Sequence, residues 1–263
     1  MALICPLCSG SSGNSILVQG GSSSILVDAG GTCKSICAAL TQAGSSYEEL
    51  DAIVLTHEHS DHIKALPVLL KKAPVPVYAT EAVLEYLAEN LKIPANVPLV
   101  PLNMAGFCIH DLHIAPFPTP HDSVGSVGYR IALPEGQHIG IATDLGHFTP
   151  QVEESLSGCQ AILLESNYDD GMILCSPYPY PLKRRIMSPK GHLSNNACAS
   201  AAVALARKGT SRFILGHLSE NNNMPQLAFQ ATQTAMDGAG MTAQEGFSVV
   251  VAKRSQCSAP LFL

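Results

Sequence analysis

The chain has 263 residues, of which 46% are hydrophobic and 14% are charged, and its formal net charge is −6. This composition allows a large core, so we expect one domain over residues 1–263, and the negative charge gives no general attraction to nucleic acid. No apolar run approaches the roughly 18 residues that span a bilayer, and the start lacks the basic segment of a signal peptide, so we expect a soluble cytoplasmic protein without membrane contact.

The predicted elements alternate along the chain. Short apolar, β-branched runs predict strands at residues 15–19, 23–28, 52–56, 75–79, 128–133, 138–143, 161–165, 212–216 and 247–252. Runs rich in Ala and Leu with polar flanks predict helices at residues 33–43, 61–72, 80–90, 195–208 and 225–239. Gly20 and Gly21 predict a hairpin turn between the first two strands, so the sheet begins antiparallel. The alternation is typical of the α/β class.

Residues 172–190 are the exception to this alternation. They hold four prolines, two tyrosines and the basic run Lys183-Arg184-Arg185. Because proline fixes φ and removes a hydrogen-bond donor, we predict a stiff, Pro-rich basic excursion outside the core, placed as a flap or insertion near the functional site.

Nine cysteines in a chain without an export signal suggest reduced thiols. Cys5 and Cys8 form a lone C-x-x-C motif, and no second such pair is present to complete a zinc ribbon. We therefore expect these two, together with Cys159, Cys175 and Cys198, to be small buried hydrophobic residues.

Three histidines and an aspartate fall within residues 57–62, directly after the predicted strand at 52–56. Side chains two apart on an extended segment point the same way, so His57 and His59 can bind one ion. A helix that begins near Asp61 can direct Asp61 and His62 toward a second position nearby. Imidazole and carboxylate ligands indicate a transition metal without specifying which one. The alternative is a solvated polar loop, which rarely needs such a concentration of histidine.

Four residues cannot complete two coordination spheres, so further ligands must come from distant parts of the chain. Asp28, Asp144 and His217 each end an apolar run, and His121 lies in a Pro-rich loop. If the strand ends lie at one edge of a sheet, these side chains can converge on the cluster at residues 57–62.

The order of these residues, with an H-x-H-x-D-H motif at 57–62, resembles the pattern of the metallo-β-lactamase superfamily from residue 28 to residue 217. This resemblance implies an α/β fold with four layers, an αββα sandwich of two mixed β-sheets with helices outside. It implies that Asp28 orients metal ligands through hydrogen bonds. It also implies two divalent ions, of which one binds His57, His59 and His121, the second binds Asp61, His62 and His217, and Asp144 bridges both.

Further strings, at residues 9–15, 164–167, 182–186, 190–195 and 216–219, resemble the YycJ/WalJ-like subgroup. That subgroup is similar to ribonuclease Z and other phosphodiesterases of the fold, and it is associated with 5′-to-3′ exonuclease activity on DNA. By the same resemblance, Glu165 and His192 stand where proton transfer is expected.

The expected function is therefore a nuclease that uses two ions of Zn, Mn or Fe. A hydroxide that bridges the ions attacks the phosphorus, Asp61 orients it, and His192 with Glu165 protonates the leaving oxygen. For His192 the alternative is a structural place beside the start of the helix at 195, with Ser194 or Asn195 as the N-cap.

The basic run Lys183-Arg184-Arg185 is interpreted as a contact to backbone phosphates, and Tyr178 and Tyr180 as platforms for bases. The alternative is a solvated loop. The expected partner is nucleic acid, with DNA favoured over RNA, and no organic cofactor is expected.

Two other functions stay open. The ligand set also permits hydrolysis of a small ester, thioester, lactone or cyclic phosphodiester, although such a reaction does not obviously need Glu165, His192 and the basic run. The second is a non-catalytic regulator that retains the fold, although all seven expected ligand positions are filled. A redox role is less favoured, because the chain carries no flavin domain.

Overall fold

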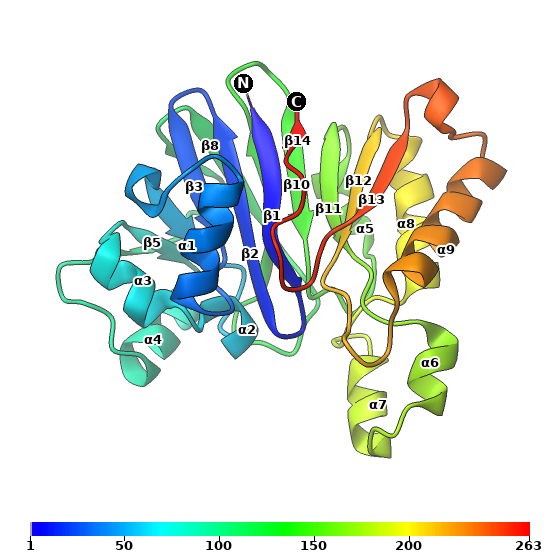
Figure 1. Cartoon of the computed structure of the whole chain (residues 1–263), viewed down its shortest axis with the longest axis horizontal. Coiled ribbons are helices and arrows are strands. Elements are labelled where there is room, and N and C mark those ends of the chain that lie inside the picture. The colour runs from blue at the N-terminus through cyan, green and yellow to red at the C-terminus, as the bar shows by residue number, and fades with distance from the viewer. Residues whose placement is uncertain (1) are drawn as a thin grey trace.

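The computed structural model describes residues 2–263 and consists of two β-sheets of seven strands each, with helices on their outer faces (Figure 1). The first sheet contains, in spatial order, β14 (Leu261–Phe262), β1 (Leu3–Gly10), β2 (Gly13–Gly20), β3 (Ser23–Val27), β4 (Ala52–Val54), β5 (Val77–Ala79) and β6 (Leu99–Pro101). The second contains β13 (Ser248–Val251), β12 (Arg212–Gly216), β11 (Ala161–Glu165), β10 (His138–Ala142), β9 (Val127–Ala132), β8 (Leu112–Pro118) and β7 (Phe107–Ile109).

Three hydrophobic layers hold these elements together. Side chains such as Ile16 and Ile25 meet Ile141 and Ile214 between the two sheets. A second layer packs the first sheet on the helices α1 (Cys33–Gln42), α3 (Leu66–Lys72) and α4 (Glu81–Asn90). A third packs the second sheet on α5 (Pro150–Leu156), α8 (Asn195–Ala206) and α9 (Pro225–Gly238). Both faces of each sheet are covered, which explains the continuous apolar runs of the central strands. The predicted αββα sandwich is confirmed.

The parallel strands bring the polar loops together. β3 to β6 are parallel to one another, and so are β10 to β13. Parallel strands end at the same edge of a sheet, and here this is the edge where Figure 1 shows the short helix α2 (Ser60–Ile63). Among the hydrogen bonds that join the sheets at this edge, two come from β9. Tyr129 of β9 donates its hydroxyl to the Leu55 carbonyl, and the Val127 N–H donates to the Thr56 carbonyl over 3.0 Å.

The helix predicted at 61–72 is interrupted. The chain forms α2 up to Ile63 and begins α3 at Leu66. Pro67 lies in the first turn of α3, where a missing N–H is tolerated, so a new helix starts directly before it. No helix within residues 2–263 has the length and apolar character to cross a membrane.

Several elements were not predicted. β1 and β8 contain Pro6, Pro116 and Pro118, which favour loops, and β1 accommodates Pro6 beside an irregularity in its pairing with β2. β6, β7 and β14 are too short to show a pattern. In the excursion at 172–190 the chain forms two short helices, α6 (Asp170–Cys175) and α7 (Tyr180–Ile186), and most of their residues are exposed.

Burial of the cysteines follows the prediction in part. Cys5, Cys159 and Cys198 are buried, and Cys8 is partly buried. The prediction was wrong for Cys175, which is exposed at the end of α6, because that short helix buries Ile173 alone.

Candidate metal centre

Three residues of the predicted site adopt an uncommon backbone conformation close behind a strand. Asp28 follows β3, Asp144 lies two residues past the end of β10, and His217 follows β12, with φ values of 61°, 56° and 54°. This left-handed region is rare for residues other than glycine, is best tolerated by Asn, Asp and His, and concentrates at functional sites. In each case the left-handed residue ends the strand, and its own side chain points to the shared edge of the sheets.

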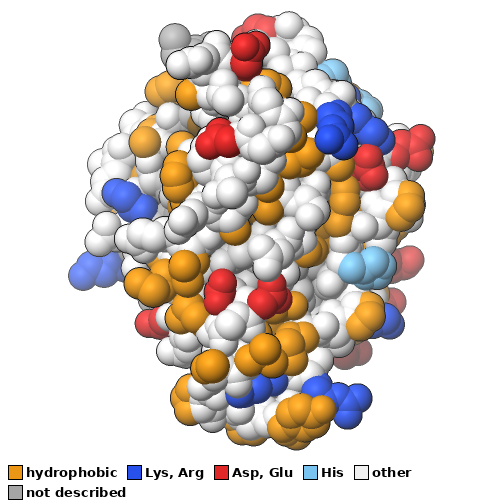
Figure 2. Space-filling view, turned by 90° about the vertical axis from the view of Figure 1, so that its right-hand side faces the viewer, with side chains coloured by type: hydrophobic (Ala, Val, Ile, Leu, Met, Phe, Trp, Pro, Cys, Tyr) orange, Lys and Arg blue, Asp and Glu red, His pale blue; other side chains and the backbone are white. Residues whose placement is uncertain are grey.

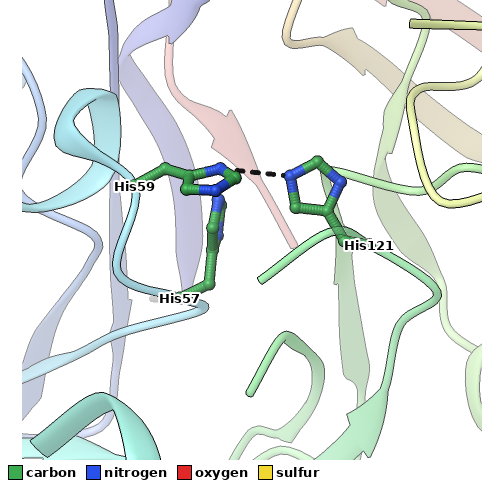
Figure 3. Close-up of side chains that lie close together, drawn as sticks. All are labelled: His57, His59 and His121. Atoms are coloured by element: carbon green, nitrogen blue, oxygen red, sulfur yellow. Dashed lines mark hydrogen bonds between the residues drawn. The ribbon is translucent and has the colours of Figure 1, made fainter. Parts of the chain in front are cut away.

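His57, His59 and His121 form the first cluster, in which two loops face each other (Figure 3). Nδ1 of His59 lies 3.2 Å from Nε2 of His121, and the rings of His57 and His59 have centroids 4.6 Å apart. His121 donates its Nδ1–H to the Gly191 carbonyl over 3.0 Å. This bond fixes the ring so that Nε2 faces the other two histidines.

Asp61, His62 and His217 form the second cluster. Oδ2 of Asp61 lies 3.4 Å from Nε2 of His62 and 3.3 Å from Nε2 of His217. Both imidazoles are buried, whereas the Asp61 side chain is 21% exposed and reaches solvent.

Asp144 lies between the two clusters. Its Oδ2 is 3.1 Å from Nε2 of His62, and its Oδ1 is 3.5 Å from Nε2 of His121 and 4.0 Å from Nε2 of His57. The structure therefore brings all seven predicted ligands into one continuous group of nitrogen and carboxylate oxygen atoms.

This donor set fits divalent metal ions. Within residues 2–263, Nε2 of His57 and Oδ2 of Asp144 are buried atoms that no geometrically acceptable hydrogen bond satisfies. Such atoms are costly to bury unless something pairs with them. In each cluster the ligand atoms lie within 4.8 Å of one another, as the ligands of one ion do.

The charges in the group act strongly on one another. Burial lowers the pKa of His57 well below its ordinary value, and His62 adds to this effect. Burial also lowers the pKa of His62, but nearby carboxylates, Asp144 first among them, outweigh it and raise that pKa well above its ordinary value. The same competition raises the pKa of His217 to about 10. Burial raises the pKa of Asp144, but the imidazoles of His217, His62 and His57 hold it well below its usual range.

Asp28 lies behind His62, on the side of the ring that faces away from the other ligands. Its Oδ2 is 2.8 Å from Nδ1 of His62, and both of its oxygens accept hydrogen bonds of 2.8 Å from Thr56, one from the N–H and one from the hydroxyl. An Nδ1–H that donates to Asp28 leaves Nε2 of His62 as the atom that faces the centre.

Asn14 and Glu58 received no role from the sequence, although both lie in the quoted motifs. The Asn14 amide donates to Oδ2 of Asp61 over 3.2 Å and lies 3.0 Å from Nε2 of His62. Glu58 accepts hydrogen bonds from the Ser123 hydroxyl and the Val124 N–H, so it ties the loop of His121 to the histidine motif. Only the convergence of distant segments reveals these contacts, and no local pattern predicts them.

Glu165 is buried at the end of β11 and contacts two histidines. Its Oε1 lies 2.7 Å from Nδ1 of His192 and 2.8 Å from Nδ1 of His217. Its Oε2 accepts the N–H groups of Leu145 and Leu193. Burial raises the pKa of Glu165, but the charge of His192 and the two imidazole hydrogen bonds lower it overall. Glu165 therefore supports a predicted metal ligand as well as His192.

His192 is not part of a helix cap. Ser194 caps α8 by accepting the Ala197 N–H, one of the two alternatives predicted from the sequence. The His192 side chain is 19% exposed and lines a cleft of about 320 Å³ together with Asp61, Asp144 and His217.

The basic run lies on α7, and its last residue, Arg185, reaches this cleft. Arg185 lines the cleft and holds Asp122 with two hydrogen bonds of 2.5 and 3.1 Å. Lys183 donates to the Leu174 carbonyl, and Arg184 lies over the ring of Tyr180. Figure 2 shows basic side chains beside hydrophobic ones on the lowest part of the molecule, which α6 and α7 form in Figure 1.

Comparison with known proteins places this centre in a family. The model of the β-lactamase superfamily domain matches residues 23–218. The chain is 32% identical over 246 residues to a protein of Bacillus anthracis named exodeoxyribonuclease YycJ, covering 92% of each chain. It is 34% identical over 226 residues to exodeoxyribonuclease WalJ of Streptococcus pneumoniae, covering 84% of this chain and 83% of that protein.

Solved structures agree on the fold. The metallo-β-lactamase fold protein YhfI of Bacillus subtilis matches with a TM-score of 0.73 at 17% identity, covering 98% of this chain and 99% of the other. Zinc-bound PqqB of Methylobacterium extorquens also gives 0.73 at 17% identity, covering both chains fully. At these identities the likeness concerns the fold alone.

Proposed function

This chain belongs to the metallo-β-lactamase superfamily, and from that premise we propose that it is a metal-dependent nuclease that removes nucleotides from the 5′ end of DNA in the cytoplasm. The observation that carries the proposal is the meeting of two His/Asp clusters through Asp144, in a cleft that also holds His192 and Arg185. The names of the two relatives, at 32% and 34% identity, support DNA as the substrate.

The centre fits two divalent ions of Zn, Mn or Fe. One would be held by His57, His59 and His121 and the other by Asp61, His62 and His217, with Asp144 shared. When bound, such a pair supplies Lewis-acid activation of the phosphate and a nucleophile at neutral pH.

The side chains of the cleft have separate tasks in this scheme. Asp61, the partly exposed carboxylate, orients the attacking water. His192 donates a proton from Nε2 to the leaving oxygen, while its Nδ1–H donates to Oε1 of Glu165 and so fixes the ring. Asp28 keeps Nε2 of His62 directed at the centre.

Substrate contacts come from α7 in the same scheme. The Arg185 guanidinium at the cleft mouth and the ammonium of Lys183 neutralise backbone phosphates. Arg184 and the exposed ring of Tyr180 offer a face on which a base can stack.

The direct test is an assay of the purified protein with single- and double-stranded DNA and RNA labelled at the 5′ or 3′ end, with Mn²⁺ or Zn²⁺. We expect stepwise loss of 5′ nucleotides from DNA. Absence of cleavage of every polymer, together with hydrolysis of a small phosphodiester or ester, would replace this proposal with a small-molecule hydrolase. Cleavage of RNA but not of DNA would show that the protein is a nuclease whose substrate is RNA.

A further inference from the structure

A second hollow, with a volume of about 670 Å³, opens beside the metal cleft. Its walls come from the β1–β2 turn, the start of α1, the residue after α2 and the segment 253–257 that follows β13. Ser11 and Ser12 are neighbours in the β1–β2 turn, and Ser11 lines the metal cleft whereas Ser12 lines this hollow. A single turn of the chain therefore separates the two.

The hollow is positively charged, although the whole chain has a net charge of −6. Lys64, Lys253 and Arg254 line it, and none of its lining residues is acidic. The Arg254 guanidinium is already used within the fold, because it donates hydrogen bonds to the carbonyls of Ser219 and Glu220. The other two are exposed, and within residues 2–263 neither forms an ion pair. Two ammonium groups thus remain available to an anion.

Backbone and hydroxyl groups form part of the lining of the hollow, beside apolar side chains such as Ile36 and Ala39. A Cβ added to Gly13 would lie 2.7 Å from the backbone nitrogen of Gly31, so the β1–β2 turn rests directly on the loop before α1. Thr32 and Ser35, the capping pair of α1, also line the hollow. The start of a helix carries partial positive charge, which adds to that of the lysines. Acceptor-rich groups can approach this surface closely.

Lys64 links the hollow to the centre. It directly follows α2, two residues after His62, so its stem starts from the same short helix that carries Asp61 and His62. With Arg185 in the metal cleft and Lys64 and Lys253 in the hollow, positive charge lies on both sides of the β1–β2 turn.

We propose that this hollow binds the phosphates of the DNA strand next to the nucleotide held in the metal cleft, so that the strand crosses the β1–β2 turn. This inference rests on the proposed nuclease function. The hollow then adds to the affinity for a long strand, because a chain with one nucleotide in the cleft places its neighbouring phosphates on Lys64 and Lys253.

The test compares the Lys64→Gln/Lys253→Gln protein with a control, Lys71→Gln/Lys92→Gln. The control removes the same charge from exposed lysines that line neither the hollow nor the metal cleft. The ligand is a fluorescent 20-nucleotide single strand with a phosphorothioate backbone, titrated over a range of salt concentrations. We expect the first variant to bind about tenfold more weakly, with a log–log salt slope smaller by about 1.4, since each phosphate contact on a single strand contributes about 0.7. The control should show neither change.

A second measurement separates the possible failures. Hydrolysis of bis(p-nitrophenyl) phosphate, which reaches only the metal cleft, should be within about twofold of wild type in both variants. If the wild type degrades DNA and the Lys64/Lys253 variant binds the strand with unchanged affinity and slope, the inference is wrong while the nuclease stands. If the wild type neither binds nor degrades DNA but hydrolyses the small diester, the nuclease proposal fails and this inference fails with it.

Discussion

The carboxylate of Asp28 shows how much of the site depends on atoms that touch no substrate. It receives two hydrogen bonds from Thr56 and holds Nδ1 of His62, all without access to solvent. The left-handed backbone at Asp28 is maintained by these contacts.

We expect Asp28→Asn to weaken metal binding by about 10- to 100-fold, because an amide nitrogen can face His62 in place of the acceptor and release the ring. Competition against a chromophoric chelator measures this affinity. Asp111→Asn is the matched control, since Asp111 accepts the same pair of bonds from the N–H and hydroxyl of Ser22 on the exposed surface. Equal metal affinity in both variants would remove Asp28 from the support of the centre.

The two partners of Glu165 can be separated by mutation. His192→Ala should lower kcat by about 10²- to 10⁴-fold and leave the metal content unchanged, because His192 donates a proton and is not a ligand in the scheme. Glu165→Gln should lower both kcat and metal content, since Glu165 also contacts His217. Elemental analysis beside steady-state kinetics provides the two readouts. Loss of metal in His192→Ala would make His192 a ligand, whereas a full rate on DNA would remove it from catalysis.

At the level of elements, the loop after β3 is packed against α2 with no room for a side chain. A Cβ at Gly30 would overlap the carbonyl oxygen of Asp61 and approach the backbone nitrogen of Asn14. The relative positions of the loop after β3, the start of β2 and α2 therefore depend on Gly30.

Gly30→Ala should lower the unfolding free energy by several kcal/mol and reduce metal content, because relief of the overlap displaces α2. Gly238→Ala at the end of α9 is the matched control. No atom lies within 4 Å of the added Cβ there, and we expect a change of less than about 1 kcal/mol. Thermal denaturation with and without metal measures both. Wild-type stability and metal content in Gly30→Ala would show that the loop yields without disturbing α2.

The helix α7 yields a separate prediction. Replacing Lys183, Arg184 and Arg185 by Gln should weaken binding of single-stranded DNA and reduce the salt slope by up to about 2, with the smaller effect if Arg185 stays bound to Asp122 in the complex. The comparison protein carries Gln at Lys71, Lys92 and Arg207, which lie outside the cleft. Unchanged affinity and slope would assign the run to a solvated surface.

For the whole molecule, the centre connects the two sheets. His57, His59, Asp61 and His62 follow β4 of the first sheet, whereas His121, Asp144 and His217 belong to loops of the second. An ion bound by ligands from both sides resists their separation, and metal binding therefore adds to folding stability.

Removal of metal should lower the melting temperature without changing the fold. At free metal a thousandfold above Kd the linkage amounts to about 4 kcal/mol, or roughly 10 °C for a chain of this size. Calorimetry of the protein before chelation, after chelation and after readdition of Zn²⁺ or Mn²⁺ measures it. An unchanged melting temperature would mean that the two sheets hold the ligands in place without an ion.

The features that could be predicted from the sequence are those that depend on interactions between neighbouring residues. Strand and helix patterns predicted most of the central elements, and the H-x-H-x-D-H motif with His121, Asp144 and His217 predicted side chains that the structure brings together, because each of these signals lies in a few neighbouring residues. Pro6 and Pro116 concealed β1 and β8, since local turn chemistry was outweighed there by pairing across the sheet. The contacts of Asn14 with Asp61, of Glu58 with the His121 loop and of Arg185 with Asp122 join distant segments, and no local pattern encodes them.

The ligands of the centre lie far apart in the sequence, so they emerge from the ribosome at different times. Asp28 and His217 are separated by most of the polypeptide, and at about 5 to 20 residues per second the ribosome delivers the second roughly 10 to 40 seconds after the first. Until β12 pairs with β11, the second cluster lacks His217, whereas His57, His59 and His121 of the first cluster have already been synthesised. The second position therefore gains its full set of ligands only in an almost finished fold, and we expect the ion there to be bound last.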